Sequence, residues 1–237
     1  MRLLVTRPEP DASAFAEELR TLGHDAILQP LLEFRILGFD RSLLKAAHAV
    51  IMTSGNAVRA IEASVARSDL ADIPFYCVGE ETAKRAHAAG FRALIATADT
   101  AERLAPRILS TARDGQIIVH LAGEHQAFDL AGALAAEGLP LQTLPVYSME
   151  ACRDLSLSVV TAMKAGEIDG AILMSPRTAG IYVSLCHSHG LHDSAKRLRY
   201  FCISENVAAK LALLMPDDVR VPDKPSRKAL LELLHAD

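Results

Sequence analysis

Short runs of apolar, often β-branched residues alternate with longer helix-forming stretches along almost the whole chain. Strands that alternate with helices pair in parallel sheets, which helices then cover. The alternation predicts strands at 2–6, 25–29, 49–53, 74–78, 93–96, 116–121, 141–144, 169–174, 199–203 and 219–221. A first helix is predicted from Asp11 to Gly23, and further helices at 56–66, 81–89, 101–110, 126–137, 155–165, 177–188, 205–214 and 227–235. The pattern predicts an α/β protein, and 237 residues favour two parallel sheets over one.

Composition and charge narrow the class of protein further. Hydrophobic residues make up 50% of the chain and charged residues 23%, which are the proportions of a globular protein. The net charge of −4, the absence of a basic run and the absence of Trp argue against a nucleic-acid partner. The apolar run 3–5 is shorter than the roughly 7 residues of a signal peptide, and no run approaches the ~20 residues of a membrane span. We therefore expect no membrane partner, a cytoplasmic location, and free thiols at Cys77, Cys152, Cys186 and Cys202.

Small hydroxyl residues or glycine follow four of the predicted strands, with Asn or Thr near the start of the next helix. The four segments are 53–58 (TSGNAV), 78–83 (VGEETA), 174–179 (MSPRTA) and 203–208 (ISENVA). Open parallel sheets bind ligands at the carboxyl ends of their strands, and backbone N–H groups at helix starts bind carboxylates and phosphates. Helix capping alone would explain any one segment, but the four together indicate binding of an anionic ligand.

The common cofactor and catalytic motifs are absent from the sequence. The chain has no G-x-G-x-x-G after a strand, no G-x-x-x-x-G-K-[ST] and no G-x-S-x-G. His187, His189 and His192 have no companion cluster of Cys or carboxylates, so we expect no metal site. No pair of Asp or Glu stands out as a general acid and base. An enzyme of this kind would act mainly by positioning a substrate that is already reactive.

Six short motifs follow one another in a fixed order. They are 6–8 (TRP), 53–58, 78–83, 144–147 (LPVY), 175–176 (SP) and 222–226 (PDKPS). In this order the chain resembles the uroporphyrinogen-III synthase family over nearly its whole length. It departs from the family at 121–125 (LAGEH), where an Arg-Gly-rich turn is frequent, and at 204–208 (SENVA), where a Gly-x-x-Thr-Ala-like turn is usual.

The resemblance implies two flavodoxin-like parallel-sheet domains joined by a two-stranded linker, with one domain discontinuous in sequence. Residues 1–33 and 150–237 would form the first domain, and 38–145 the second, inserted one. The linker strands would lie at about 31–35 and 145–149. The strand candidates then divide into five for each domain.

The implied activity is cyclisation of hydroxymethylbilane, a linear tetrapyrrole, to uroporphyrinogen III with inversion of ring D. The family needs no cofactor or metal, and we expect a monomer. The resemblance gives Tyr147 a catalytic role, in which its hydroxyl assists the loss of water from the hydroxymethyl carbon. Candidate substrate contacts are Arg7, Ser54, Asn56, Thr82, Ser175, Arg177 and Ser204. The alternatives are a capping role for Arg7 and a packing role for Tyr147.

Two other functions share the expected architecture. A cofactor-free two-domain racemase would need two cysteines at facing strand ends as opposing bases. Cys77 and Cys202 fall within predicted strands instead, and neither is followed directly by Asn or Thr. A non-catalytic two-domain sensor of small anions would carry the same turns as the synthase, so the sequence leaves that alternative open.

Overall fold

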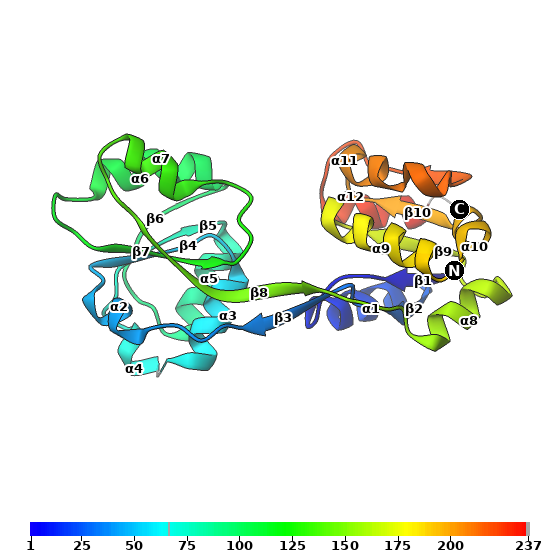
Figure 1. The fold of residues 1–237 in the computed structure, drawn as a ribbon, viewed down its shortest axis with the longest axis horizontal. Helices are drawn as coiled ribbons and strands as arrows, with labels where there is room; N and C mark the ends of the chain where they lie inside the picture. The colour runs from blue at the N-terminus through cyan, green and yellow to red at the C-terminus, as the bar shows by residue number, and fades with distance from the viewer. Residues whose placement is uncertain (66, 236–237) are drawn as a thin grey trace. The chain divides into compact units, whose positions relative to one another are not determined.

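The computed structural model, which describes residues 1–65 and 67–235, contains two sheets of mainly parallel strands (Figure 1). The chain divides into two compact units. Unit 1 comprises Met1–Phe34 and Glu150–Asp237, and unit 2 comprises Arg35–Met149. Strands and helices alternate in both units, so the predicted α/β class with two sheets of mainly parallel strands is confirmed.

The sheet of unit 1 has five parallel strands in the order β11-β10-β9-β1-β2. The strands are β1 (Arg2–Val5), β2 (Asp25–Leu28), β9 (Gly170–Leu173), β10 (Arg199–Cys202) and β11 (Asp218–Arg220). In chain order this is the flavodoxin-like arrangement, with the strand order reversing between β1 and β9.

Successive residues of each buried strand in unit 1 face opposite layers of helices. Leu4 and Tyr200 belong to one apolar cluster, with α8 (Leu157–Ala165) and α9 (Pro176–Ser188), whereas Leu3 and Phe201 belong to another. The second cluster includes α1 (Asp11–Thr21) and α12 (Arg227–Glu232). The remaining helices are α10 (His192–Lys196), α11 (Glu205–Ala208) and the 3₁₀ helices Ala209–Leu214 and Leu233–His235. The sheet is therefore buried on both faces, which explains its continuous apolar strands.

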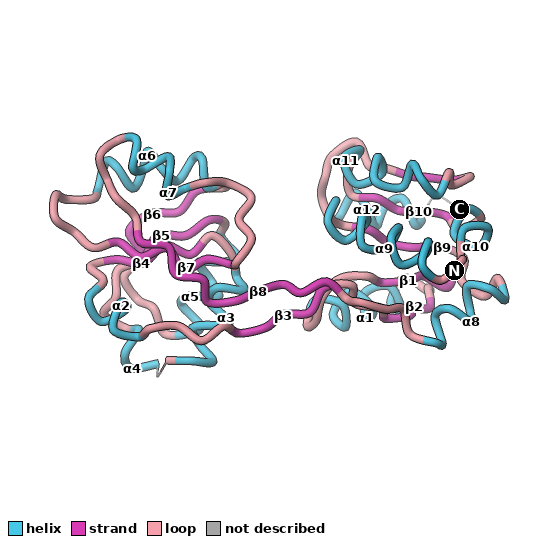
Figure 2. The backbone as a smooth tube through the Cα atoms, viewed as in Figure 1, coloured by secondary structure: helices cyan, strands magenta, loops and turns pink. Residues whose placement is uncertain are grey.

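The sheet of unit 2 has six strands in the order β3-β8-β7-β4-β5-β6. They are β3 (Leu32–Ile36), β4 (Ala49–Met52), β5 (Phe75–Val78), β6 (Leu94–Ala98), β7 (Ile118–Gly123) and β8 (Gln142–Ala151). The strand order reverses between β4 and β7, because β5 and β6 extend the sheet on one side of β4 and β7 and β8 on the other. The chain passes between the units along β3 and β8 (Figure 2).

Helices cover both faces of the second sheet as well. Figure 1 shows α6 (Ala101–Thr111) and α7 (Leu130–Ala136) on one face, and α3 (Gly55–Ser64) and α5 (Glu80–Ala89) on the other. The short helices α2 (Arg41–Ala46) and α4 (Arg67–Leu70) complete the unit. Ile51, Ile118, Leu104 and Leu134 pack together on the face that α6 and α7 cover.

The structure differs from the predicted elements in a few places. The strand predicted at 141–144 and the linker strand predicted at 145–149 are one continuous strand, β8. The helix predicted at 126–137 begins only at Leu130, because Asp129 is its N-cap and accepts a hydrogen bond from the Gly132 N–H. The helices predicted at 205–214 and 227–235 finish as 3₁₀ helices, and α2, α4 and α10 were not predicted.

Candidate functional site

A cavity of about 480 Å³ lies in unit 2 at the carboxyl ends of its strands. Thr53 follows β4, Val78 ends β5, Gly123 ends β7, and Tyr147 lies in β8, and all four line the cavity. Asp99 and Thr100, between β6 and α6, line it as well. It therefore includes the point where the strand order reverses, which is the usual ligand position in open α/β sheets. Its volume is within the range of small-molecule sites.

The turn after β4 contributes the predicted residues Ser54 and Asn56. Ser54 is the N-cap of α3, and its Oγ accepts a hydrogen bond of 3.1 Å from the Asn56 N–H. The buried side chains of Ala57, Val58 and Ile61 fix the helix against the sheet. Ser54 lines the cavity, whereas the Asn56 amide donates to the Met149 sulfur at 3.7 Å. Capping uses one lone pair of Ser54, so its hydroxyl proton can still be donated to a ligand.

Tyr147 is positioned by an irregularity in β8. Ala122 pairs with Pro145 but Gly123 pairs with Tyr147, so Val146 is an extra residue opposite β7. A bulge of this kind re-aims the side chain that follows it. Tyr147 is 8% exposed, and its ring lies against Gly123, where a Cβ atom would be 2.7 Å from Cζ and 2.9 Å from Oη. Only glycine at position 123 leaves room for the tyrosine in this orientation.

His120 lies in the interior of β7 and also lines the cavity. It is 1% exposed, and its Nε2 is 3.1 Å from the Thr53 Oγ1. Burial lowers the pKa of His120 from 6.5 to about 4, so the imidazole is neutral at pH 7. Its Nδ1 is buried and has no hydrogen-bond partner among the residues that the structure describes.

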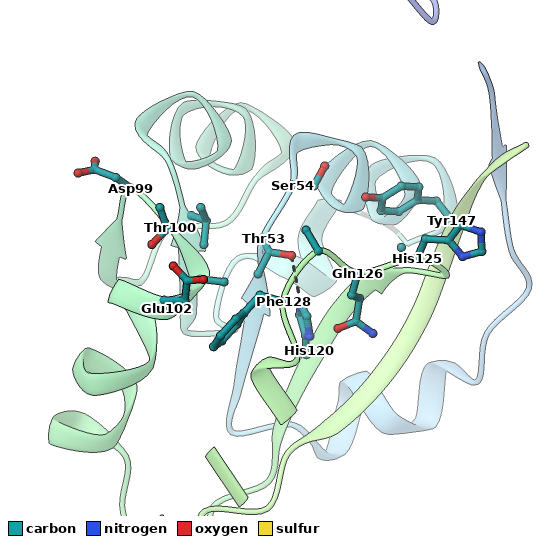
Figure 3. A pocket seen from close by; sticks show the side chains of 14 residues that line it. Thr53, Ser54, Asp99, Thr100, Glu102, His120, His125, Gln126, Phe128 and Tyr147 are labelled. Carbon is teal, nitrogen blue, oxygen red and sulfur yellow. Dashed lines mark hydrogen bonds between the residues drawn. The ribbon is translucent and has the colours of Figure 1, made fainter. Parts of the chain in front are cut away.

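The charges around the cavity are uneven. In Figure 3, Asp99, Thr100 and Glu102 lie on one side, Tyr147 and His125 on the other, and Thr53 and His120 between them. Thr100 is the N-cap of α6 and accepts a hydrogen bond from the Arg103 N–H. Arg103 also forms an exposed ion pair of 3.5 Å with Asp99, which offsets only part of the acidic charge.

Thr82, the remaining predicted contact of unit 2, is buried in the first turns of α5 and is not among the residues that line this cavity. The other predicted contacts belong to unit 1. Arg7 follows β1 and pairs with Asp11 at 2.9 Å, and its Nη1 also donates to the Met174 sulfur at 3.3 Å. Ser175 caps α9 by accepting from the Thr178 N–H, Arg177 is exposed, and Ser204 precedes α11 without a side-chain capping bond.

Sequence reasoning did not single out Thr53 or His120. Thr53 lies within the motif 53–58, but the capping pattern of that motif points to the residues after it. His120 could have been found, because it is the one ionisable side chain in the apolar strand predicted at 116–121. Buried ionisable groups in clefts are frequent at functional sites.

Residues 1–65 and 67–235 offer few other functional features. In this part of the chain no group of three or more His, Cys, Asp or Glu is arranged to hold a metal ion. No helix there has the length and apolar character needed to cross a membrane. Burial raises the pKa of the Cys202 thiol to about 12 and also raises the pKa of Cys77, which disfavours either as a thiolate base.

Comparison with known proteins gives one family and a set of similar structures. The profile of the family described as uroporphyrinogen-III synthase HemD matches residues 13–232. Uroporphyrinogen-III synthetase from Helicobacter pylori is 21% identical, with a TM-score of 0.67 over 99% of this chain and 98% of that one. A mutant uroporphyrinogen III synthase from Thermus thermophilus is 16% identical, with a TM-score of 0.56 over 99% and 97%. At these identities the two structures establish likeness of fold. A search of curated proteins finds no significant match.

Proposed function

We propose a function for this chain, which belongs to the uroporphyrinogen-III synthase family. The chain closes hydroxymethylbilane to uroporphyrinogen III. Water leaves the terminal hydroxymethyl carbon and an azafulvene remains. Attack by the substituted carbon of ring D gives a spiro intermediate, which reopens and recloses with ring D inverted. The substrate also cyclises unaided to isomer I, so the task of the protein is to select the geometry of closure.

The cavity of unit 2 is proposed to bind part of this substrate. Hydroxymethylbilane carries carboxylates on its side chains and N–H donors on its pyrrole rings. The carboxylates should avoid Asp99 and Glu102 and take hydrogen bonds on the side of Ser54 and Tyr147, at the positive N-terminal end of the α3 dipole. The carboxylates of the protein can accept from pyrrole N–H groups. The uneven charge thereby favours one orientation of the substrate.

Tyr147 is proposed to donate a hydrogen bond to the departing hydroxyl group. The C–O bond breaks with its electron pair on oxygen, which leaves as water after gaining a proton. Electrons of the pyrrole form the new exocyclic C=C bond, and loss of the N–H proton completes the balance. A tyrosine hydroxyl, with a reference pKa of about 10, assists such a step without having to ionise.

We also propose that the two units are the domains of the protein, with the two linker strands in β3 and β8. Substrate contacts are proposed at Asn56, Thr82, Arg7, Ser175, Arg177 and Ser204. Family membership supports assignment as a lyase of tetrapyrrole biosynthesis that acts in the cytoplasm as a monomer.

The observation that carries the proposal is the packing of Tyr147 on Gly123 at the edge of the cavity, because bulge and glycine together direct this hydroxyl. The test is incubation of the purified chain with freshly prepared hydroxymethylbilane, followed by oxidation and separation of the porphyrin isomers. We expect isomer III to predominate. Isomer I formed at the rate of the protein-free control would refute the proposal. Tight binding of the substrate without isomer III would instead support the anion sensor.

A further inference from the structure

His120 is a buried polar side chain in the cavity to which the proposed reaction assigns no role. It lies beside Ile51 of β4 in the sheet register, two residues after Ile118 on its own strand. Ile51 and Ile118 belong to the apolar cluster under α6 and α7. An apolar residue would suit this position, because a buried nitrogen without a partner costs free energy.

The hydrogen bonds of His120 constrain its tautomer. A neutral imidazole has one N–H donor and one acceptor nitrogen. A proton on Nδ1 would leave a buried N–H group with no acceptor among the described residues, since only Nε2 contacts Thr53. A proton on Nε2 leaves only an acceptor without a partner, and orphaned buried donors are the rarer case in proteins. The geometry therefore favours an Nε2–H that donates to the Thr53 Oγ1.

This tautomer determines what Thr53 can do. When its oxygen accepts from His120, the hydroxyl proton is free to be donated elsewhere. Thr53 lines the cavity at the point where the strand order reverses between β4 and β7. Its hydroxyl then offers the cavity a hydrogen-bond donor that carries no charge.

We propose that His120 is a positioning residue that holds Thr53 as a hydrogen-bond donor to a carboxylate of the substrate. The inference rests on the proposed function, since that function supplies the carboxylate. It also explains why a histidine occupies an apolar strand, where leucine would fill the space without an unpaired nitrogen.

Four single variants test the inference, each assayed for KM and kcat with hydroxymethylbilane and for thermal stability. His120→Leu should raise KM by on the order of tenfold with little change in kcat, while the melting temperature stays equal or rises. His120→Gln, whose amide can donate to Thr53, should recover most of the affinity. Thr53→Val should raise KM to the same extent, and Thr53→Ser should not.

The double variant shows whether His120 acts through Thr53. In the Thr53→Val background, adding His120→Leu should leave KM unchanged, because the hydroxyl to be oriented is already absent. An equal further rise in KM would overturn the positioning role. So would a folded His120→Leu protein with the KM of the wild type. If His120→Leu does not fold, a Thr53→Val protein with wild-type KM overturns the inference by itself.

The pH dependence separates a neutral from a charged histidine. The ratio of the His120→Leu KM to the wild-type KM should stay constant between pH 6 and 8. Asp99, Glu102, His125 and Tyr147 line the same cavity, but they are present in both proteins and cancel in the ratio. A ratio that grows steadily as the pH falls would mean that a cationic His120 attracts the substrate, and would overturn the inference.

The assays also separate failure of the inference from failure of the proposed function. If the wild type forms isomer III and all variants have the wild-type KM, the inference is refuted and the proposed function stands. If the wild type forms no isomer III, the proposed function is refuted as well.

Discussion

The two sheets end in similar turn motifs, yet the polar side chains at those turns have different surroundings. In unit 1, the Ser175 Oγ lies 2.7 Å from the Thr178 Oγ1 and accepts from the Thr178 N–H, while Arg7 pairs with Asp11. In unit 2, Ser54 caps its helix in the same way but also lines a cavity. The same turn motif thus places its hydroxyl against a neighbouring side chain, as at Ser175, or beside a cavity, as at Ser54.

The cavity depends on the course of the chain after β7. Gly123 ends β7 and α7 begins only at Leu130, so the residues between them form a loop. His125, Gln126 and Phe128 of this loop line the cavity. The capping bond from the Gly132 N–H to Asp129 sets the start of α7 and thereby preserves the loop. The loop between β7 and α7, and not the turn motif after β4 alone, therefore gives the sheet of unit 2 a cavity at the carboxyl ends of its strands.

The largest expected effect is that of Tyr147→Phe, which probes the edge of unit 2. The ring of Phe keeps the packing on Gly123, so only the hydroxyl is lost. We expect kcat to fall by roughly 10- to 100-fold, the low end of general acid catalysis, because the leaving group also departs unaided. Product analysis should still give mainly isomer III. Wild-type turnover would remove Tyr147 from the mechanism, whereas mainly isomer I would mean that it steers ring D.

Tyr200→Phe in unit 1 is the matched control for this change. Its hydroxyl is fully buried and donates to the Ala195 carbonyl at 2.8 Å. Removing it should lower the free energy of unfolding by about 1 kcal/mol and leave kcat unchanged.

The second prediction is that the pH dependence of stability differs between the two units. His120 has a folded-state pKa of about 4 against an ordinary value of 6.5, so folding favours its neutral form. Above pH 6.5 the histidine is neutral in both the folded and the unfolded state, and the stability of unit 2 is at its full value. That stability is lost progressively as the pH falls from 6.5 toward 4, because the unfolded state then binds a proton that the folded state does not. At pH 5 the loss should be about 2 kcal/mol. Hydrogen exchange of β4 and β7 at pH 7 and pH 5 measures it, with β9 and β10 of unit 1 as the reference.

The same measurement on His120→Leu separates the contribution of His120 from that of the acidic residues. We expect the additional destabilisation of β4 and β7 to disappear in this variant. An identical pH dependence in wild type and variant would show that His120 is accessible to protons in the folded state.

The sequence predicted the strands well because continuous apolar runs such as 117–119 require burial on both faces of a sheet. The helices predicted at 81–89 and 155–165 end as predicted, because Gly90 and Gly166 are the C-caps of α5 and α8, with φ values of +118° and +71°. The helix predicted from 126 began late because Asp129 offers a better cap than any earlier residue. The His120–Thr53 contact joins residues 67 positions apart, and no local pattern reports such a contact. The bulge at Val146 likewise depends on how β8 pairs with β7.

The third prediction tests the positioning of Tyr147 by Gly123→Ala. The added Cβ would lie within 3.0 Å of two ring carbons and the hydroxyl oxygen of Tyr147, so the side chain must move. We expect kcat to fall by about tenfold, since a displaced hydroxyl loses its alignment. In a Tyr147→Phe background the same change should lower kcat much less, because no hydroxyl remains to be displaced.

Gly180→Ala in α9 of unit 1 is the matched glycine control. A Cβ at Gly180 meets nothing within 4 Å, and alanine is the better helix former. We expect unchanged kcat and a gain in stability of roughly 0.5–1 kcal/mol. A Gly123→Ala protein that behaves like this control would show that the Tyr147 ring adapts without cost.

The smallest expected effects come from the paired changes Ser54→Ala and Ser175→Ala, which compare the two edges directly. Each removes an N-cap and should lower the free energy of unfolding by about 1 kcal/mol. Ser226→Ala, at the cap of α12 in unit 1, measures the cost of a lost cap alone.

Ser54→Ala should in addition raise KM for hydroxymethylbilane about threefold to tenfold, as expected for one hydrogen bond. Ser175→Ala should raise it less, because the Ser175 hydroxyl is already engaged with Thr178. Equal rises in KM for the two variants would show that Ser54 and Ser175 contribute equally to substrate binding, despite their different surroundings. A KM for Ser54→Ala that matches Ser226→Ala would mean that the serine after β4 serves its helix only.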